Sequence, residues 1–279
     1  MRLMTTAILS ALLCSGSVAQ SPEKPALTAV YTYADVADLA LAAKLVAHVK
    51  IKRAKKLPKA LAQGVPAGVT RYIITADVVA LVRGDEGIDP RVTYLVDVAT
   101  DSRALGSLVS KGEVFIFAHP GRPGEVQLVA PDAQLPWSAE TADMVRKILR
   151  DSVKPSAPPP VTGIASAFFN PGALPGESET QMFLESGRPV SLTIVRTPDQ
   201  SVNWFASLGD SVADGRLPPR RNTLLWYRLA CFLPVTVPDA VLSDQSAESA
   251  AAIRADYAVV MAGLGPCKRA RKTIQRAGG

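Results

Sequence analysis

The stretch KLVAHVKIKR, residues 44–53, alternates between apolar and polar side chains, and it decides how the first half of the chain folds. Positions 45, 47, 49 and 51 are apolar, whereas positions 48, 50 and 52 carry His or Lys. Successive side chains of a β-strand point to opposite faces of the sheet. The stretch therefore predicts a half-buried strand with a charged outer face.

The residues on both sides of this strand predict further strands and two helices. Residues 71–83 keep the same period of two, and more strands are expected at 91–98, 113–118 and 125–129. Helical spacing of apolar residues predicts a short helix at 33–42. A second helix begins after Ser138 and presents one apolar stripe. Five strands with flanking helices in residues 30–150 predict a small antiparallel β-barrel, closed or partly closed.

A proline-rich segment separates this part of the chain from the rest. Residues 151–160 have no apolar period and are typical of a semi-extended linker. The second half, residues 161–279, opens with an apolar stretch at 161–169 and a loop rich in turn-forming residues at 170–176. Strands at 179–185, 189–196 and 202–208 predict an antiparallel meander. The predicted fold class is therefore α+β, with the barrel followed by a meander that packs against two helices.

The two helices of the second half are predicted from residues 224–233 and 247–262. The run LLWYRLACFL lacks Val, Ile and Thr, which favour strands, and Pro234 ends it. Asn222 or Thr223 is expected to cap this helix. Apolar residues of the second helix recur at helical spacing until glycines and Pro266 stop it, and Cys267 follows at once.

Residues 1–19 have the pattern of a secretory signal peptide: one arginine, a short apolar segment and small residues near the end. We expect cleavage between Ala19 and Gln20. A lipoprotein anchor at Cys14 is the alternative, although the bulky Leu13 precedes that cysteine. The apolar segment is shorter than the about 20 residues that span a bilayer. The protein is therefore expected to be soluble and periplasmic or secreted, with no transmembrane segment.

Export decides how the cysteines are interpreted. Once Cys14 leaves with the signal peptide, Cys231 and Cys267 remain as an even pair in an oxidising compartment. A disulfide between them would close a loop of about 36 residues and, in the chain-entropy model, stabilise the fold by roughly 4 kcal/mol. In redox-active pairs, only two residues separate the cysteines, whereas Cys231 and Cys267 are far apart in the sequence. We therefore expect a structural disulfide that ties the two C-terminal helices together.

The charge of the chain is positive and clustered. The formal net charge is +6, and removal of Arg2 with the signal peptide leaves +5. Such clusters can bind anionic envelope material, or they can be solvated faces. Nucleic acid is not expected, because the protein is exported and no aromatic residue interleaves with the clusters. The first cluster holds Lys50, Lys52, Arg53, Lys55, Lys56 and Lys59, and the second, interpreted as a solvated tail, holds Lys268, Arg269, Arg271, Lys272 and Arg276.

Few residues offer catalytic chemistry. The chain has two histidines, His48 and His119, and neither has metal-ligand spacing. No serine lies in a nucleophile-elbow motif and the sequence has no Gly-rich phosphate-binding loop, so no metal and no cofactor is expected. Carboxylates at positions 97, 101, 177 and 179 leave an acid–base pair open. Arg228 requires a partner if it is buried. Glu248 and Asp256 are the candidates for an ion pair, and a bound carboxylate or phosphate is the alternative.

The order of elements in residues 30–150 resembles the OB-like domain of the tissue-inhibitor-of-metalloproteinase and netrin superfamily. The local match is KGEVFIFA, residues 111–118. The cysteines that form disulfides in many members are absent, so inhibition of proteases is not implied for this chain. The whole chain also resembles exported proteins of alphaproteobacteria, and that resemblance implies no activity.

These observations favour an exported, non-catalytic binding or scaffold protein that contacts anionic envelope material or a protein partner. The alternative is an envelope hydrolase with a carboxylate pair in a cleft between the two halves. A secreted protease inhibitor is a third hypothesis, which rests on analogy of fold alone.

Overall fold

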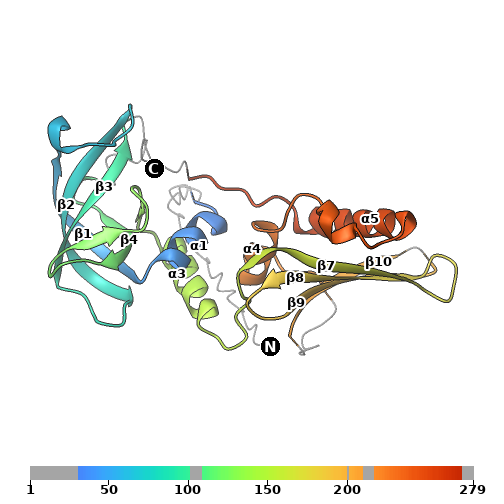
Figure 1. Cartoon of the computed structure of the whole chain (residues 1–279). Helices are drawn as coiled ribbons and strands as arrows, with labels where there is room; N and C mark the ends of the chain where they lie inside the picture. Colours follow the sequence, from blue (N-terminus) through green and yellow to red (C-terminus); the bar gives the residue numbers. More distant parts are fainter. Residues whose placement is uncertain (1–30, 101–108, 200, 210–216, 272–279) are drawn as a thin grey trace, which may run out of the picture.

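The structure is a computed structural model that describes residues 31–100, 109–199, 201–209 and 217–271. The expected signal peptide and its cleavage site lie outside these residues. The described chain is α+β, with two antiparallel sheets, as predicted. Figure 1 places one sheet at each end of the molecule, with helices between them.

The first sheet holds six strands, one more than the sequence predicted. Its path runs β3-β2-β1-β4-β5, and the short β6 also pairs with β4. The segment of β6 carries too few residues to show a period of two, which is why the sequence did not reveal it. The elements of this half are α1 (Tyr33–Ala42), β1 (Leu45–Lys56), η1 (Lys59–Leu61), β2 (Val69–Arg83), β3 (Arg91–Ala99), β4 (Glu113–Pro120), β5 (Val126–Leu128), β6 (Gln134–Pro136) and α3 (Ala139–Ser152).

The strong twist of this sheet lets one face enclose its own core. The apolar positions of residues 45–51 point into that core, where they meet side chains from β2, β3 and β4. On the opposite face, Val46, Phe115 and Phe117 are buried in a second core together with α1 and α3. One face of the first sheet therefore lines its own core, and the other face is buried only where the helices cover it.

Strand β3 comes close to β5 at the ends of the sheet path. Thr93 and Glu125 form an isolated parallel bridge, and the Thr93 N–H donates to the Gly124 carbonyl at 2.8 Å. The Asp97 N–H likewise donates to the Pro131 carbonyl at 2.8 Å. The described strands do not form a closed ladder here, so the OB-like barrel stays a prediction.

The second sheet is an antiparallel meander in the order β10-β9-β8-β7. Its strands are β7 (Val161–Pro171), β8 (Ser178–Ser186), β9 (Val190–Arg196) and β10 (Val202–Leu208). One face packs against α5 (Ala247–Leu264), as Figure 1 shows. The other face keeps Phe168 and Phe183 exposed, at 49% and 42% of their surface.

A buried carboxylate joins α5 to this sheet. Asp256 is 1% exposed and accepts a hydrogen bond from Arg196 Nε at 2.6 Å. It also accepts a hydrogen bond from the Thr180 hydroxyl. A charge buried in this way must be paired, and the two donors from β8 and β9 pair it.

The helix predicted from LLWYRLACFL is shorter than expected. It forms α4 (Leu224–Ala230), is capped by Thr223, and is followed by the short η2 (Asp239–Leu242). Cys231 ends α4 and forms the predicted disulfide with Cys267, with 5.1 Å between their Cα atoms. The disulfide therefore fixes the end of α4 to the segment that follows α5.

That segment, Pro266 to Arg271, returns to α1 (Figure 1). Asp35 is 1% exposed and accepts hydrogen bonds from the backbone N–H groups of Ala270 and Arg271. Arg269 pairs with Asp38, and Arg271 pairs with Asp132, each at about 2.6–2.7 Å. The interpretation of this cluster as a solvated tail is wrong for these two arginines, because carboxylates far away in the sequence neutralise them.

The helical core contains residues from both sides of the proline-rich linker. Side chains of α1, α3 and β4 lie in one buried cluster with those of β7, β8, β9, α4 and α5. The two predicted domains therefore share a core, although their boundary at residues 151–160 stays a prediction.

Candidate functional site

Five exposed cations lie along the second half of β1. We call them the basic stripe: Lys50, Lys52, Arg53, Lys55 and Lys56. The register with β2 shifts between Ile51 and Arg53. Such a β-bulge sets two residues of one strand against one residue of its partner. Lys52 and Arg53 can therefore both face solvent, which concentrates positive charge on this part of the strand.

Only one cation of the basic stripe is paired within the described part of the chain. Lys52 Nζ lies 3.3 Å from Asp77, which also accepts a hydrogen bond from Arg91 at 2.7 Å. Hydrogen bonds from Arg91 and Lys52 hold the pKa of Asp77 below its ordinary value. The ion pairs of the described residues include none to Lys50, Arg53, Lys55 or Lys56. The basic stripe thus keeps four cations free for an anionic ligand.

The pairing of strands connects the basic stripe to a hollow in the surface. Lys55 lies opposite Ile73 on β2, and Ile73 lies opposite Leu95 on β3. Residues paired in this way across antiparallel strands share one face of a sheet. Ile73 and Leu95 line a hollow of about 390 Å³ between β3 and β5.

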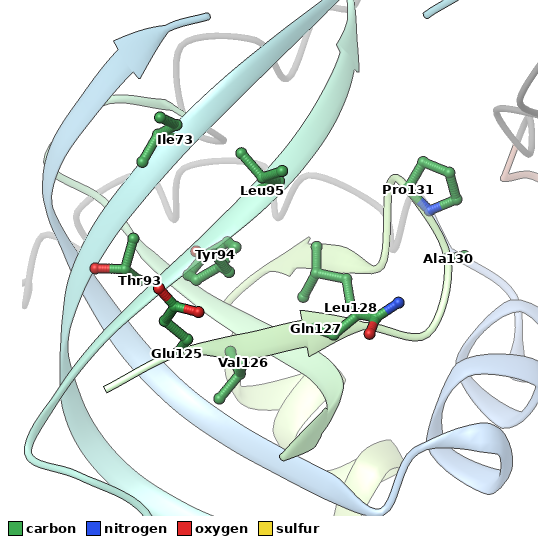
Figure 2. Close-up of a pocket in the computed structure, with 10 residues that line it drawn as sticks. All are labelled: Ile73, Thr93, Tyr94, Leu95, Glu125, Val126, Gln127, Leu128, Ala130 and Pro131. Carbon is green, nitrogen blue, oxygen red and sulfur yellow. The ribbon is translucent and has the colours of Figure 1, made fainter. Parts of the chain in front are cut away.

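Figure 2 shows this hollow with its lining side chains. Thr93 and Leu95 come from β3, and Glu125 and Gln127 come from the facing edge at β5. Behind them, Tyr94 is 2% exposed, and burial raises the pKa of its hydroxyl. The hollow offers apolar walls and a few polar groups next to the basic stripe, which is a usual composition for a ligand-binding groove.

At the other end of the basic stripe, an exposed tryptophan stacks on a histidine. The rings of Trp137 and His48 lie 5.3 Å apart with 13° between their planes. His48 Nε2 lies 2.9 Å from Glu113 Oε2. The backbone N–H of Trp137 donates a hydrogen bond to the backbone carbonyl of Glu113 at 3.0 Å. Trp137 is 42% exposed, so the three residues form an ordered aromatic and acidic patch on the surface.

Arg228 has neither of the partners expected from the sequence. Asp256 is occupied by Arg196 and Thr180, and the ion pairs of the described residues do not include Arg228. Its guanidinium lies 5.7 Å from the centre of the Tyr227 ring. Burial lowers the pKa of Arg228. Within the described residues, its Nε and the buried Tyr33 hydroxyl have no hydrogen-bond partner.

The carboxylates considered for acid–base catalysis are engaged elsewhere. Asp97 is 2% exposed and accepts two hydrogen bonds of 2.7 Å from Arg71, and these hydrogen bonds raise the pKa of Arg71. Glu177 accepts a hydrogen bond from the Leu174 N–H, and Glu179 accepts one from Gln181. Asp101 lies outside the described residues. These contacts give no support to a pair of carboxylates that face each other in a cleft.

No group of three or more His, Cys, Asp or Glu side chains within the described ranges could hold a metal ion. None of the helices in those ranges is long and apolar enough to cross a membrane.

Sequence reasoning placed Lys50 and Lys52 on an exposed strand face, but it ended the strand at Arg53, whereas β1 continues to Lys56 and Lys59 lies in η1. It also missed Trp137 and Glu113. Glu113 is the register partner of Lys50, and only the pairing of β1 with β4 brings them together. Compared with known proteins, the chain matches no protein-family profile and no curated protein. The function must therefore be inferred from the surface itself.

Proposed function

We propose that the protein is an exported, non-catalytic binding protein whose basic stripe holds an anionic component of the envelope. The observation that carries this proposal is the set of three unpaired cations, Lys50, Arg53 and Lys55, beside an open hollow on the same face of the first sheet, with the exposed Lys56 at the end of the strand. Unpaired cations on a surface attract anionic ligands and need no rearrangement to do so.

The first sheet is, in this proposal, an OB-like barrel. The strand path β3-β2-β1-β4-β5 and the parallel approach of β3 to β5 support that interpretation. OB-folds bind extended polymers on the face of their second and third strands. Leu95 of β3 and Ile73 of β2 belong to that face and line the hollow, so an extended ligand fits this part of the surface.

The proposed location follows from the signal-peptide pattern, with cleavage at Ala19 and Gln20. The Cys231–Cys267 disulfide supports it, because structural disulfides persist in oxidising compartments. The periplasm or the extracellular space then provides the ligand, and acidic glycans and anionic lipid head groups are the anionic polymers and surfaces found there.

The test is a binding measurement on a variant that carries Arg53→Gln, Lys55→Gln and Lys56→Gln together. We expect its affinity for an anionic probe, either oligogalacturonate or vesicles with anionic phospholipid, to fall by about 100-fold at low salt. The estimate follows from roughly 1 kcal/mol for each cation near an anionic surface.

A matched control changes three exposed cations of α3 to glutamine: Arg146, Lys147 and Arg150. Both variants lower the net charge by the same amount. The control therefore shows whether binding depends on the position of the cations or only on the net charge of the protein. Equal losses in the two variants, or no binding of the parent protein to either probe, would contradict the proposal.

A further inference from the structure

The patch of Trp137, His48 and Glu113 lies at one end of the basic stripe, and we infer that it binds one sugar ring of an acidic glycan. The inference rests on the proposed function and names the class of its ligand. It is carried by the contacts of these three residues and by their place beside Lys50.

The indole of Trp137 is held as a flat platform. His48 lies against one of its faces, with 13° between the ring planes. The His48 side chain is itself only 12% exposed, and its Nε2 is fixed by Glu113 at 2.9 Å. The hydrogen bond from the backbone N–H of Trp137 to the backbone carbonyl of Glu113 fixes the main chain of the tryptophan. His48 occupies one face of the indole and Trp137 is still 42% exposed, which leaves surface on which the apolar face of a sugar ring can stack.

The polar groups beside the indole match the substituents of an acidic sugar. Glu113 uses Oε2 for His48, and its Oε1 makes no hydrogen bond within the described part of the chain. A free carboxylate oxygen accepts hydrogen bonds from hydroxyl groups. Lys50 lies opposite Glu113 on β1, is exposed, and has no ion pair among the described residues. Its ammonium group can pair with the carboxylate or phosphate of the same sugar.

The basic stripe continues the site along β1. Side chains two positions apart on one face of a strand lie about 7 Å apart; Lys50 and Lys52 form one such pair, Arg53 and Lys55 form the next after the β-bulge, and together they extend the positive charge along β1. The ligand would therefore begin at Trp137 and run along β1 toward the hollow between β3 and β5.

The position of Glu113 favours a glycan over the other anionic polymers. An aromatic ring next to cations can also stack a nucleic-acid base. The free carboxylate oxygen of Glu113 can accept hydrogen bonds from the hydroxyl groups of a sugar ring, whereas the nucleotides along a single DNA strand carry no free hydroxyl group to donate. A lipid surface would meet the basic stripe and would not require the platform at all.

Tryptophan fluorescence tests this inference on the mature chain. Trp204 and Trp226 are 5% exposed, so Trp137 is the solvent-facing member of the three tryptophans. We expect oligogalacturonate to shift the emission to shorter wavelength, whereas a neutral oligosaccharide, an oligothymidylate and anionic vesicles should leave it unchanged. Trp137→Ala should weaken oligogalacturonate binding by about 10-fold, the effect of losing one aromatic contact.

Three further variants complete the test. Trp137→Phe keeps a ring and should recover most of the affinity, which separates a lost platform from a disturbed fold. Glu113→Ala should weaken binding severalfold, because it removes both the acceptor for the sugar hydroxyl groups and the partner that fixes His48. Phe168→Ala is the matched control, an exposed aromatic residue on the second sheet, and should bind as the parent does.

The outcomes separate this inference from the proposed function. If the glutamine variants of the basic stripe lose glycan binding and Trp137→Ala binds as the parent does, the sugar platform is wrong and the proposed function stands. If oligothymidylate quenches Trp137 at lower concentration than oligogalacturonate, the ligand class is wrong. If no anionic probe binds the parent protein, both the inference and the proposed function fall.

Discussion

The two sheets of the protein each have an uncovered face, and the two faces differ in chemistry. On the first sheet, the outer face beyond α1 and α3 carries the basic stripe and the Trp137 patch. On the second sheet, the face opposite α5 carries Phe168 and Phe183, whose rings meet edge to face at 6.2 Å. The open face of the first sheet thus carries a row of cations, and that of the second sheet carries a pair of phenylalanine rings.

The difference follows from how each sheet obtains its core. The first sheet twists enough to enclose Val49, Ile51 and Ile74 on its own concave face, so its outer face is free to be polar. The second sheet depends on α5, which it holds through Asp256 and through buried side chains such as Met182 and Ile194. A sheet that relies on a separate helix is easier to disrupt by a single change, and that difference can be tested.

The largest effect is expected for Asp256→Ala. The change leaves Arg196 and Thr180 without their buried partner, which should lower the free energy of unfolding by about 4 kcal/mol. Urea unfolding followed by circular dichroism measures this loss. Asp239→Ala is the control, because Asp239 is 94% exposed and pairs with Arg254; it should cost less than about 1 kcal/mol. Equal costs would mean that α5 is not held through Asp256.

A smaller effect is expected from two neighbouring residues of β8. Met182 is fully buried, so Met182→Ala should cost about 3 kcal/mol of unfolding free energy. Phe183 points to the open face, and Phe183→Ala should cost less than about 1 kcal/mol. Thermal unfolding of the two variants compares the faces directly. If Phe183→Ala were as costly as Met182→Ala, the aromatic face would be covered in solution.

The smallest effect on stability is expected for Asp77→Asn on the first sheet. The pKa of Asp77 in the folded state lies below its ordinary value, because Arg91 and Lys52 donate hydrogen bonds to it. The carboxylate therefore stabilises the fold above about pH 4, and this contribution is lost as the pH falls through the lowered pKa. Parent and variant should differ slightly in thermal stability at pH 7 and become equal in strong acid.

The same substitution also tests the charged face. It frees Lys52 and Arg91, so binding of oligogalacturonate should become stronger at neutral pH. Asp85→Asn is the control, since Asp85 is exposed and makes no ion pair within the described residues. If Asp77→Asn bound oligogalacturonate more weakly than this control, the positive charge of the outer face would not determine its affinity for the glycan.

Several elements could be predicted because the signal is local. The period of two in residues 44–53 is sufficient to place Val49 and Ile51 inside and Lys50 outside. The lack of β-branched residues in LLWYRLACFL is sufficient to predict α4. The disulfide followed from the expected compartment and from the even number of cysteines that remain after export.

Other features depend on contacts between distant segments and could not be predicted. Asp256 was a candidate partner for Arg228, but it shares a helix face with Ile253, Tyr257 and Val260, which are all buried. Its carboxylate therefore meets the sheet and not α4. Trp137 meets His48 only because β4 lies between the segments that carry them.

By itself the sequence determined which side chains share a strand face, which segment is a helix and which cysteines can pair. These properties depend on residues within a few positions of one another or on the composition of the whole chain. The tertiary structure decided which faces stay open, which carboxylates neutralise Arg269 and Arg271, and that Trp137 stands beside the basic stripe. Those outcomes are set by strand register and by packing between segments that are distant in the sequence, where no local pattern carries the information.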